Sequence, residues 1–517
     1  MANKSLFASY AGKLLPRATK TNRAGAPAYA LEPRHQLAQL AVTGTLSGTF
    51  YASASSQLAD VTELVGKVDP AFIAKAAIYA RKKGHMKDMP ALLLAALSAI
   101  DPVTFARAFP RIVDNGKMLR TFVQIMRSGA AGRKSLGSRP KRMVEAWLNA
   151  ATDRQILDAA VGQSPSLADV IKMVHPKPAT PERRALYAYL IGKPYDVALV
   201  PEAVRAFEAF KRDPAAPVPD VPFQMLTSLE LTPEHWAAIA GKAGWQMLRM
   251  NLNTFDRQCV FAIPGMTEQI ASRLKDENEI RKSRVLPYQL MSAYTAASND
   301  VPLAVREALQ DAMEIAIANV PAIDGKVVVC PDVSGSMSSP VTGYRKGASS
   351  AVRCIDVAAL VSAALLRANT AARVLPFECG VVNVALNPRD TVLTNAAKLA
   401  SIGGGGTNCS APLAKLNAER AAVDLVVFVS DNQSWMDARR ADRTGLMAEW
   451  TKLKARNPRA KLVCIDVQPY GTTQAVERED VLNVGGFSDA VFETIAAFAA
   501  GKIGPAHWVG EIEKIAL

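Results

Sequence analysis

Cysteine and long apolar runs are both scarce in this chain. Its 517 residues include six cysteines and no Cys-x-x-Cys pair, so we expect neither a disulfide framework nor a structural zinc site. No run of about 18 apolar residues occurs, and the first residues lack the apolar core and cleavage pattern of a secretory signal. These features predict a cytoplasmic protein with no membrane partner.

Acidic residues are scarce in the N-terminal third. Residues 1–150 contain 22 Lys or Arg and 8 Asp or Glu, whereas the remaining 367 residues contain 39 of each kind. The net charge of +14 therefore comes entirely from the first third. Such a local excess favours a polyanionic partner for that region. For any single cluster of cations, a solvated charged surface is the simpler alternative.

The chain is long enough for two or three domains. Residues 31–322 show the spacing of short amphipathic helices, several of them opened by steps such as Asp69-Pro70 and Asp101-Pro102. These steps supply a capping side chain followed by proline at the first helical position. Short, alanine-rich helices with short connections predict stacked helical hairpins, an α-solenoid.

The periodicity changes at about residue 323. Strand-like runs at 326–330, 372–377, 425–429 and 461–466 alternate with helical stretches near 348–369, 409–421, 437–455 and 488–501. This order predicts a doubly wound parallel sheet over residues 323–505, with Val381–Leu386 as an added edge strand. Residues 1–30 are predicted to form an irregular basic arm, and residues 506–517 a tail that packs back on the helical domain.

Side chains carrying oxygen follow two of the predicted strands. An apolar run ends at Asp332-Val-Ser334-Gly-Ser336, a second ends at Asp431, and a glycine loop delivers Thr407. Because the carboxyl ends of parallel strands meet at one edge of a sheet, we expect these groups to form one site. The predicted metal ligands are Asp332, Ser334, Ser336, Thr407 and Asp431. Oxygen ligands suit Mg²⁺, with Ca²⁺ and Mn²⁺ as alternatives, and Mg²⁺ keeps waters that a partner could replace.

Three simpler or competing interpretations of these loops are weaker. Ser, Gly and Asp are turn residues in any case, so the Asp-x-Ser-x-Ser stretch alone would be a weak signal. The glycine loop has neither the spacing of a dinucleotide site nor the Gly-Lys-Ser/Thr of a P-loop. The three elements in this order resemble the metal-ion-dependent adhesion site (MIDAS) of von Willebrand factor A domains.

Three segments of the helical region carry candidate RNA-binding side chains. The first is rich in glycine and serine, so its cations can approach phosphates closely. In the second, a Lys and a His lie on one helical face, although a His there could equally cap the helix C-terminus. In the third, an Arg interrupts an apolar run whose Asn251 and Asn253 could simply cap a turn. The candidates are Arg127, Arg133, Lys134, Arg139, Lys141, Arg142, Lys172, His175 and Arg249.

Together these segments resemble the Ro 60 kDa autoantigen family, in which a TROVE module precedes a von Willebrand factor A domain. The resemblance spans nearly the whole chain and is closest to a bacterial member, because the chain is compact and has no zinc finger. The motifs that carry it, besides the A-domain loops, are Thr21–Gly25, Thr49–Ser53, Gly132–Gly137 with Arg139–Arg142, and His175–Pro178.

The resemblance implies a ring of HEAT-like helical repeats with a basic central hole. Single-stranded 3′ ends of misfolded RNA would enter the hole, and small noncoding (Y-like) RNA would bind the outer surface. Lys172 and His175 would face the RNA, and the cluster at residues 133–142 would contact phosphates. A hole of this kind admits a single strand but not a duplex.

The function implied is a monomeric, non-enzymatic ribonucleoprotein component in RNA quality control. It would bind no DNA, and in bacteria it could work with an exoribonuclease. The alternative is a metal-dependent protein-interaction module whose helices are only a scaffold. An enzyme has the least support, because no nucleophile-activating pair or phosphate-cradling loop accompanies Asp332 and Asp431.

Overall fold

The computed structural model describes residues 16–132, 134–283, 285, 287–317, 320–344, 352–436, 443–486, 490–504 and 506–517. Contacts divide the chain into two compact units. The unit that we call the A-domain unit comprises Met1–Lys67, Ile280–Ala296 and Leu309–Lys514. The helical unit comprises Val68–Glu279, Ala297–Ala308 and Ile515–Leu517. The sequence instead predicts one helical domain over residues 31–322. The contacts place the start of that range, up to Lys67, in the A-domain unit.

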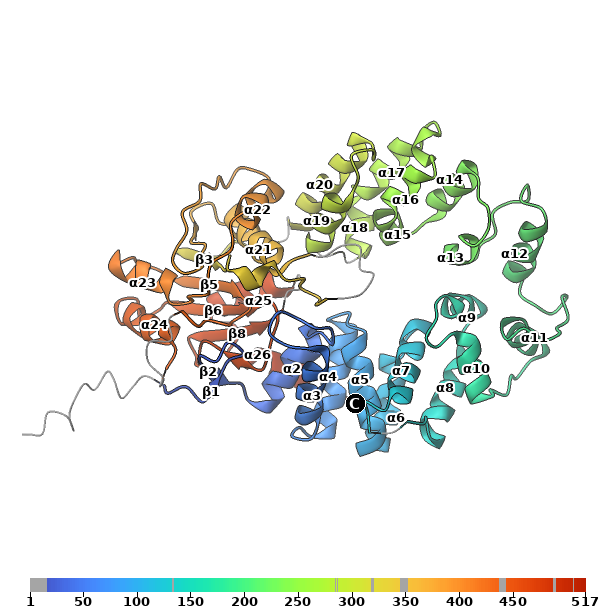
Figure 1. The fold of residues 1–517 in the computed structure, drawn as a ribbon, viewed down its shortest axis with the longest axis horizontal. Helices are drawn as coiled ribbons and strands as arrows, with labels where there is room; N and C mark the ends of the chain where they lie inside the picture. The colour runs from blue at the N-terminus through green and yellow to red at the C-terminus, as the bar shows by residue number, and fades with distance from the viewer. Residues whose placement is uncertain are drawn as a thin grey trace, which may run out of the picture. The chain divides into compact units, whose positions relative to one another are not determined.

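A five-stranded parallel sheet forms the centre of the A-domain unit (Figure 1). Its order is β4 (Arg373–Val374), β3 (Val327–Pro331), β5 (Leu425–Ser430), β6 (Lys461–Asp466) and β8 (Val481–Gly485). Every residue of β3 and β5 is buried, as expected where helices cover both faces of a parallel sheet. The doubly wound part of the predicted fold is therefore confirmed.

Helices alternate with these strands, as the sequence predicts. They are α21 (Cys354–Ala368), α22 (Val392–Ala400), α23 (Ala411–Ala418), α24 (Gly445–Arg456) and α25 (Ala490–Ala499), with a short 3-10 turn, η2 (Gly335–Ser338). The core between sheet and helices includes Phe377 and Phe428, whose ring centroids are 5.5 Å apart. It also holds Trp450, which is fully buried and donates its indole N–H to Asp480 Oδ2 at 2.9 Å.

Two elements of this unit differ from the sequence prediction. Val381–Leu386 forms no strand, apart from an isolated bridge between Phe377 and Val381. The chain instead runs as a loop tied to α22, where the Asn395 amide donates to the Asn387 carbonyl at 2.7 Å. The two edge strands are β4, which falls in the predicted run 372–377, and β8. The apolar pattern of β8 is broken by Asn483 and Gly485, so the sequence analysis missed it.

The N-terminal segment joins the A-domain unit. Strands β1 (Lys20–Thr21) and β2 (Pro27–Ala30) form a hairpin that extends antiparallel to β7 (Thr472–Thr473). The side chain of Asn22 shapes the turn, since its oxygen accepts the backbone N–H groups of Ala24 and Ala26. Residues 16–30 therefore contain regular structure, whereas the sequence predicts an irregular arm; residues 1–15 of that arm lie outside the described ranges.

Further helices of the A-domain unit are α2 (Pro33–Thr43), α3 (Ala54–Val65), α19 (Pro287–Ala296) and α26 (His507–Glu513). The C-terminal α26 packs against α2, and Arg34 pairs with Glu513 at 3.1 Å. The sequence predicts that this tail packs on the helical domain. Helix α2 lies within the range predicted for that domain, but its contacts group it with the A-domain unit. The boundary between the two units falls within helices α18 (Glu277–Ser283) and α20 (Leu303–Ile317), so each of them has residues in both units.

The helical unit is built from short helices in chain order. They are α4 (Pro70–Lys82), α5 (Asp88–Ile100), α6 (Pro102–Ile112), α7 (Gly116–Ser128), α8 (Ser138–Ala150), α9 (Asp153–Ala160), α10 (Leu167–Val174), α11 (Pro181–Leu190), α12 (Glu202–Arg212), α13 (Phe223–Leu226), α14 (Pro233–Lys242), α15 (Trp245–Met250), α16 (Leu252–Arg257), η1 (Val260–Ala262) and α17 (Met266–Leu274). Asp69 and Asp101 cap α4 and α6 as predicted, each accepting backbone N–H groups of the first turn.

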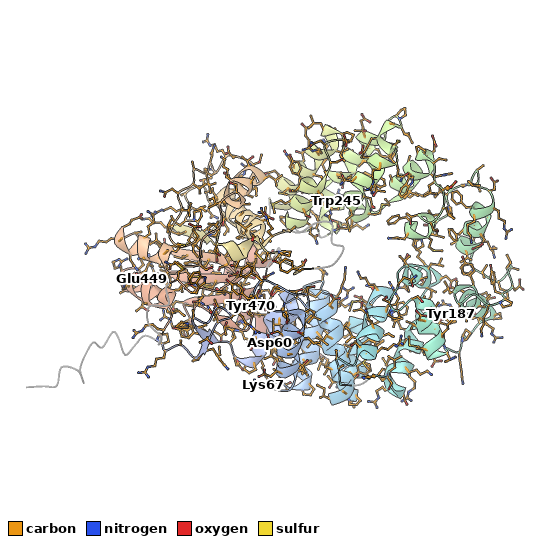
Figure 2. The ribbon with its side chains drawn as sticks, viewed as in Figure 1. Asp60, Lys67, Tyr187, Trp245, Glu449 and Tyr470 are labelled. Carbon is orange, nitrogen blue, oxygen red and sulfur yellow. The ribbon has the colours of Figure 1, made fainter. Side chains whose placement is uncertain are left out.

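Neighbouring helices of this unit pack through apolar side chains. Phe105, Phe109 and Phe122 of α6 and α7 are fully or almost fully buried, with ring centroids 5.4–5.9 Å apart. Tyr187 of α11, labelled in Figure 2, reaches back to α8 and donates its hydroxyl to the Leu148 carbonyl at 2.8 Å. Within the described ranges, none of the helices is both long enough and apolar enough to span a lipid bilayer.

Candidate functional site

The five predicted metal ligands meet at the end of the parallel sheet where the strands have their C-termini. Asp332 follows β3, Asp431 follows β5, and both carboxylates are almost completely buried. The Ser334 and Ser336 hydroxyl oxygens are 3.3 Å apart, and Thr407 Oγ1 donates to Ser334 Oγ at 3.0 Å. The Ser336 side chain lies close to the Asp431 carboxyl and partly offsets the rise in its pKa. The structure therefore places all five oxygen-bearing side chains in one buried cluster.

Backbone and side-chain hydrogen bonds hold the loops of this cluster. Asp332 Oδ1 accepts the Ser334 N–H at 2.8 Å, and Oδ2 accepts the Ser430 hydroxyl at 2.6 Å. The glycine loop is tied to the first loop, because the Gly335 N–H donates to the Gly405 carbonyl at 2.9 Å. Gly404 has a φ of 121°, a conformation that only glycine adopts readily.

The electrostatics of the cluster call for a positive charge. Burial raises the pKa of Asp332, and burial together with the nearby Asp332 charge raises the pKa of Asp431 to about 7. A third buried carboxylate, Asp466 at the end of β6, has its pKa raised by burial and by Asp431. No Lys or Arg of the described chain is among the groups that stabilise these carboxylates. A divalent cation would supply the missing positive charge.

The donor set fits Mg²⁺ better than a softer metal. Within the described ranges, no group of three or more His, Cys, Asp or Glu side chains is arranged to hold a metal ion. The cluster at the sheet edge instead combines two carboxylates with three hydroxyls, which suits a hard cation that keeps some of its waters. Asp332, Ser334, Ser336, Thr407 and Asp431 would hold the cation.

Three residues of this site were not identified from the sequence. Ser430 and Asp466 terminate β5 and β6, so their position at strand ends was a usable signal. Tyr51 comes from the loop between α2 and α3 and lies near enough to Asp431 and Asp332 for their charges to act on its hydroxyl. Burial and the charges of Asp431 and Asp332 raise the pKa of Tyr51 to about 12. In the sequence this tyrosine belongs to the Thr49–Ser53 motif of the family resemblance, but nothing in that motif links it to the cluster, which lies far away in the chain.

Part of the predicted RNA-binding set gathers around helices α7, α8 and α10. Arg127 lies in the last turn of α7 and Lys172 lies on α10, and both side chains are exposed. Hydrogen bonds from Ser166 lower the pKa of Asp169 most, and the charges of Lys172 and Arg127 lower it further. The chain after α10 is held on α8, because the Lys177 N–H donates to Glu145 Oε1 at 3.0 Å.

The remaining cations of this region lie on α8 or immediately before it. Arg139 and Arg142 are exposed in the first turns of α8, Lys141 is half-buried, and Lys134 is exposed beside Gly129. Arg133 lies outside the described residues. We call Arg127, Lys134, Arg139, Lys141, Arg142 and Lys172 the α7–α10 cation cluster.

The other two candidates, His175 and Arg249, have contacts within their own helical segments. His175 ends α10 in a left-handed conformation with φ 52°, its N–H donating to the Ile171 carbonyl at 2.9 Å, so it occupies the capping position while its side chain stays exposed. Arg249 bonds to Gln246 Oε1 at 3.0 and 3.2 Å, and its helix α15 lies apart from α7, α8 and α10 (Figure 1). The structure therefore does not bring Arg249 into the cation cluster.

The two asparagines after Arg249 have the structural roles that the sequence left open. The Asn251 amide donates to the Met247 carbonyl at 2.8 Å, and Asn253 Oδ1 accepts the Ser298 N–H at 2.9 Å. Both interactions tie short helical segments together, as expected of capping residues.

Comparisons with known proteins agree with this architecture. Residues 326–499 match the family model described as the Ro60 vWA domain. The chain is 25% identical over 519 aligned positions to the RNA-binding protein RO60 of Deinococcus radiodurans, covering 93% of this chain and 95% of the relative. It is also 25% identical to the RNA-binding protein RO60 of Caenorhabditis elegans, over 46% of this chain and 37% of that one.

A solved structure has the same fold. The crystal structure of the Deinococcus radiodurans RO (RSR) protein aligns with a TM-score of 0.63 and 21% sequence identity, covering 91% of this chain and all of that one. The fold match extends over both the helical part and the A domain. Together with the family model over residues 326–499 and the curated relatives, it agrees with the resemblance predicted from the motifs: residues 326–499 form a domain of the Ro60 vWA type, and the chain is similar to RO60 proteins over nearly its whole length.

Proposed function

We propose that this protein binds RNA, and that it holds small noncoding RNA and the single-stranded 3′ ends of misfolded RNA without acting as an enzyme. The observation that carries the proposal is the exposed α7–α10 cation cluster in a chain whose relatives are named RNA-binding proteins. The proposed role is RNA quality control, in which an exoribonuclease could act on the RNA that this protein presents.

The chemistry of the cation cluster supports phosphate binding. Arg139 and Arg142 project from the N-terminal turns of α8, where the helix dipole also favours an anion. Arg127 and Lys172 add cations from two neighbouring helices. Contacts of this kind recognise the backbone rather than the base sequence, which suits a protein that receives RNAs of many sequences.

The test compares two RNAs in a salt-titrated binding assay: a hairpin with a single-stranded 3′ tail and the same hairpin made blunt. A variant with Arg133, Lys134, Arg139, Lys141 and Arg142 changed to Gln should lose tail-dependent binding. A matched control changes five exposed cations of the A-domain unit, Lys326, Arg389, Arg420, Arg459 and Lys502, and should retain it. Equal binding of both hairpins, or equal loss in both variants, would contradict the proposal.

We further propose that the sheet-edge cluster binds a divalent cation, most readily Mg²⁺. Two buried carboxylates with no counter-charge from the described residues, next to three hydroxyls joined by hydrogen bonds, support this assignment. When bound, the cation would supply a positively charged position that can accept an oxygen ligand.

A metal-dependent protein-interaction role is the second candidate for the A domain. It is favoured by the exposed apolar side chains of Trp435 and Met436 beside the cluster. The backbone N–H groups of both residues donate to the Thr407 carbonyl at 3.1 Å. Large exposed apolar groups at a site rim are typical of protein contacts. This role and RNA binding by the helical unit are compatible, because they use different residues.

A further inference from the structure

The turn of the N-terminal hairpin contacts the chain that directly follows a proposed metal ligand. Residues 432–434, which we call the support segment, come after the carboxylate at the end of β5 and are buried. The Asn22 side chain donates to the Ser434 carbonyl at 2.7 Å, and the Arg23 N–H donates to Gln433 Oε1 at 2.8 Å. The hairpin and the support segment both belong to the A-domain unit.

Gln433 links the hairpin turn to the Asp431 carboxylate. Its side-chain oxygen accepts the Arg23 N–H, and its side-chain nitrogen donates to the Asp431 carbonyl at 3.1 Å. Its backbone N–H donates to Asp431 Oδ1 at 3.2 Å. One residue therefore separates the hairpin from a carboxylate that would hold the cation.

Ser434 makes a corresponding link to Thr407, another proposed ligand. The Ser434 carbonyl accepts the Asn22 amide, and its hydroxyl donates to the Thr407 carbonyl at 3.4 Å. The same hydroxyl accepts the Cys409 N–H at 3.0 Å, which holds the chain just after Thr407. Two proposed ligands from separate loops are thus joined to the hairpin through the support segment.

Contacts from the hairpin side also stabilise an uncommon backbone conformation in this segment. Asn432 has a φ of 59°, in the left-handed region that few residues other than glycine adopt. Its carbonyl accepts the Gln474 amide at 3.0 Å. Gln474 directly follows β7, which pairs with β2 of the hairpin. The hairpin therefore acts on the support segment both directly, through its turn, and indirectly, through β7.

Departure of the hairpin would leave buried polar groups without partners. Gln433 and Ser434 are at most 1% exposed, and buried amide and carbonyl groups are almost always hydrogen-bonded. The support segment would have to shift to reach other partners or water, and it would move Asp431 and the Thr407 loop with it. Mg²⁺ requires closely defined ligand positions, so this shift would weaken cation binding.

We propose that the hairpin turn positions the cation site, so that docking of the hairpin and binding of a divalent cation stabilise each other. This inference rests on the proposed cation site. Asn22 and Gln433 are positioning residues, because they act through Asp431 and Thr407 and are not ligands themselves. Such coupling is reciprocal, so a bound cation must also hold the hairpin more firmly on the A domain.

The test uses Mn²⁺ as the probe and variants of the full chain. Gln433→Met keeps the length of the side chain but removes both of its hydrogen bonds, and Asn22→Ala loosens the turn and removes its bond to the support segment. Asn457→Ala is the matched control. Asn457 also holds a loop by its backbone, donating to the Ala421 carbonyl at 3.2 Å and accepting the Val423 N–H at 3.1 Å, but this loop precedes β5.

Calorimetric titration should show a fall in Mn²⁺ affinity of about tenfold in Gln433→Met and in Asn22→Ala, at the lower end of the cost of removing a group that orients a metal ligand. The Asn457→Ala variant should keep the affinity of the unmodified chain. Thermal unfolding checks that each variant is folded at the temperature of the titration.

Hydrogen exchange measures the reciprocal effect. In the unmodified chain, Mg²⁺ should slow exchange of the amides of residues 17–30 by the same factor of about ten. In Asp332→Ala, which removes a ligand from the β3 loop, Mg²⁺ should leave this exchange unchanged. The measurement needs no change in the support segment, so it decides the question even if Gln433→Met does not fold.

The outcomes separate the coupling from the site on which it rests. Mn²⁺ binding that is lost in Asp332→Ala but unchanged in Gln433→Met and Asn22→Ala would overturn the coupling alone, as would hairpin exchange that Mg²⁺ does not slow. An equal loss of affinity in Asn457→Ala would also overturn it, because general loosening of the domain would then be sufficient. Absence of Mn²⁺ binding in the unmodified chain would overturn the cation site and the coupling with it.

Discussion

At the scale of single residues, the unusual feature is a set of buried carboxylates with no cation from the described protein chain beside them. Asp332, Asp431 and Asp466 end three adjacent strands and are all at most 3% exposed. Burying a charge without a partner is costly. The residues therefore favour either protonation or a bound cation, and the pH decides between the two.

The pH dependence of stability follows from the Asp431 carboxyl. Its pKa is raised from 3.8 to about 7 on folding, so between these values the folded state holds a proton that the unfolded state has released. The free energy of unfolding of the cation-free protein should then fall as pH rises through this window, and the loss should be complete above it.

Mg²⁺ should reverse that loss, because it binds the ionised carboxylates. The increase in the A-domain melting temperature on adding Mg²⁺ should be small at about pH 5 and larger at about pH 8. Thermal melts with Mg²⁺ or with a chelator, at several pH values, measure both effects. A stabilisation by Mg²⁺ that is independent of pH would show that these carboxyls are not its ligands.

Replacing Asp332 separates the two proposed activities. We expect Asp332→Ala to weaken divalent cation binding strongly, because it removes one of the two carboxylates among the five ligands, and to leave RNA affinity nearly unchanged. Calorimetric titration with Mn²⁺ and an RNA-binding assay on the same preparation provide the measurements. A loss of RNA affinity of tenfold, about 1.4 kcal/mol, or more would contradict this division of labour.

At the scale of elements, helix packing in the helical unit depends on close approach at one glycine. Gly116 begins α7 and is buried against α9, where an added Cβ would lie 2.0 Å from the Ala159 Cβ. At that separation the two helices must move apart, because backbone atoms of Ala159 are also close, at 2.6 Å.

Gly116→Ala should therefore destabilise the helical unit by about 1–3 kcal/mol, the usual cost of overpacking. Gly241→Ala is the matched control: Gly241 lies in α14, and the only neighbour of an added Cβ there is the flexible end of Gln269, at 3.8 Å. The higher helix propensity of alanine should make that change neutral or slightly stabilising. Urea unfolding followed by circular dichroism should show the two effects with opposite signs.

At the scale of the whole molecule, the asymmetry of charge is the dominant feature. All of the net +14 resides in residues 1–150, which include the whole of α7 and α8. Phosphate contacts release counterions, so RNA affinity should fall steeply with salt concentration.

The salt dependence of the affinity also gives the number of phosphate contacts. For single-stranded RNA, the slope of log affinity against log salt is about −0.7 for each phosphate contact, so neutralising all five cations of the binding variant should make the slope shallower by up to about 3.5. The five-cation control in the A-domain unit should leave the slope unchanged. A slope that changes equally in both variants would indicate a general charge effect instead of a defined site.

Much of the A domain and its site could be predicted from the sequence. Apolar runs too short for helices, alternating with helical stretches, specify parallel strands, and the topology of such a sheet brings Asp332, Thr407 and Asp431 to one edge. Local chemistry is sufficient here because each ligand directly follows a strand or lies in a glycine loop. The same reasoning could not recognise β8, whose pattern is interrupted by Asn483.

The sequence by itself thus determined the order of the two kinds of structure, the five oxygen-bearing side chains that lie together, and the location of the excess positive charge, because all three depend on periodicity or composition along the chain. Only the tertiary structure decided that residues 16–30 add strands to the A-domain unit, that Arg249 lies away from the cation cluster, and that Tyr51 lies near the buried carboxylates. The physical reason is that these relations depend on contacts between segments far apart in the chain, which leave no periodic signal in either segment.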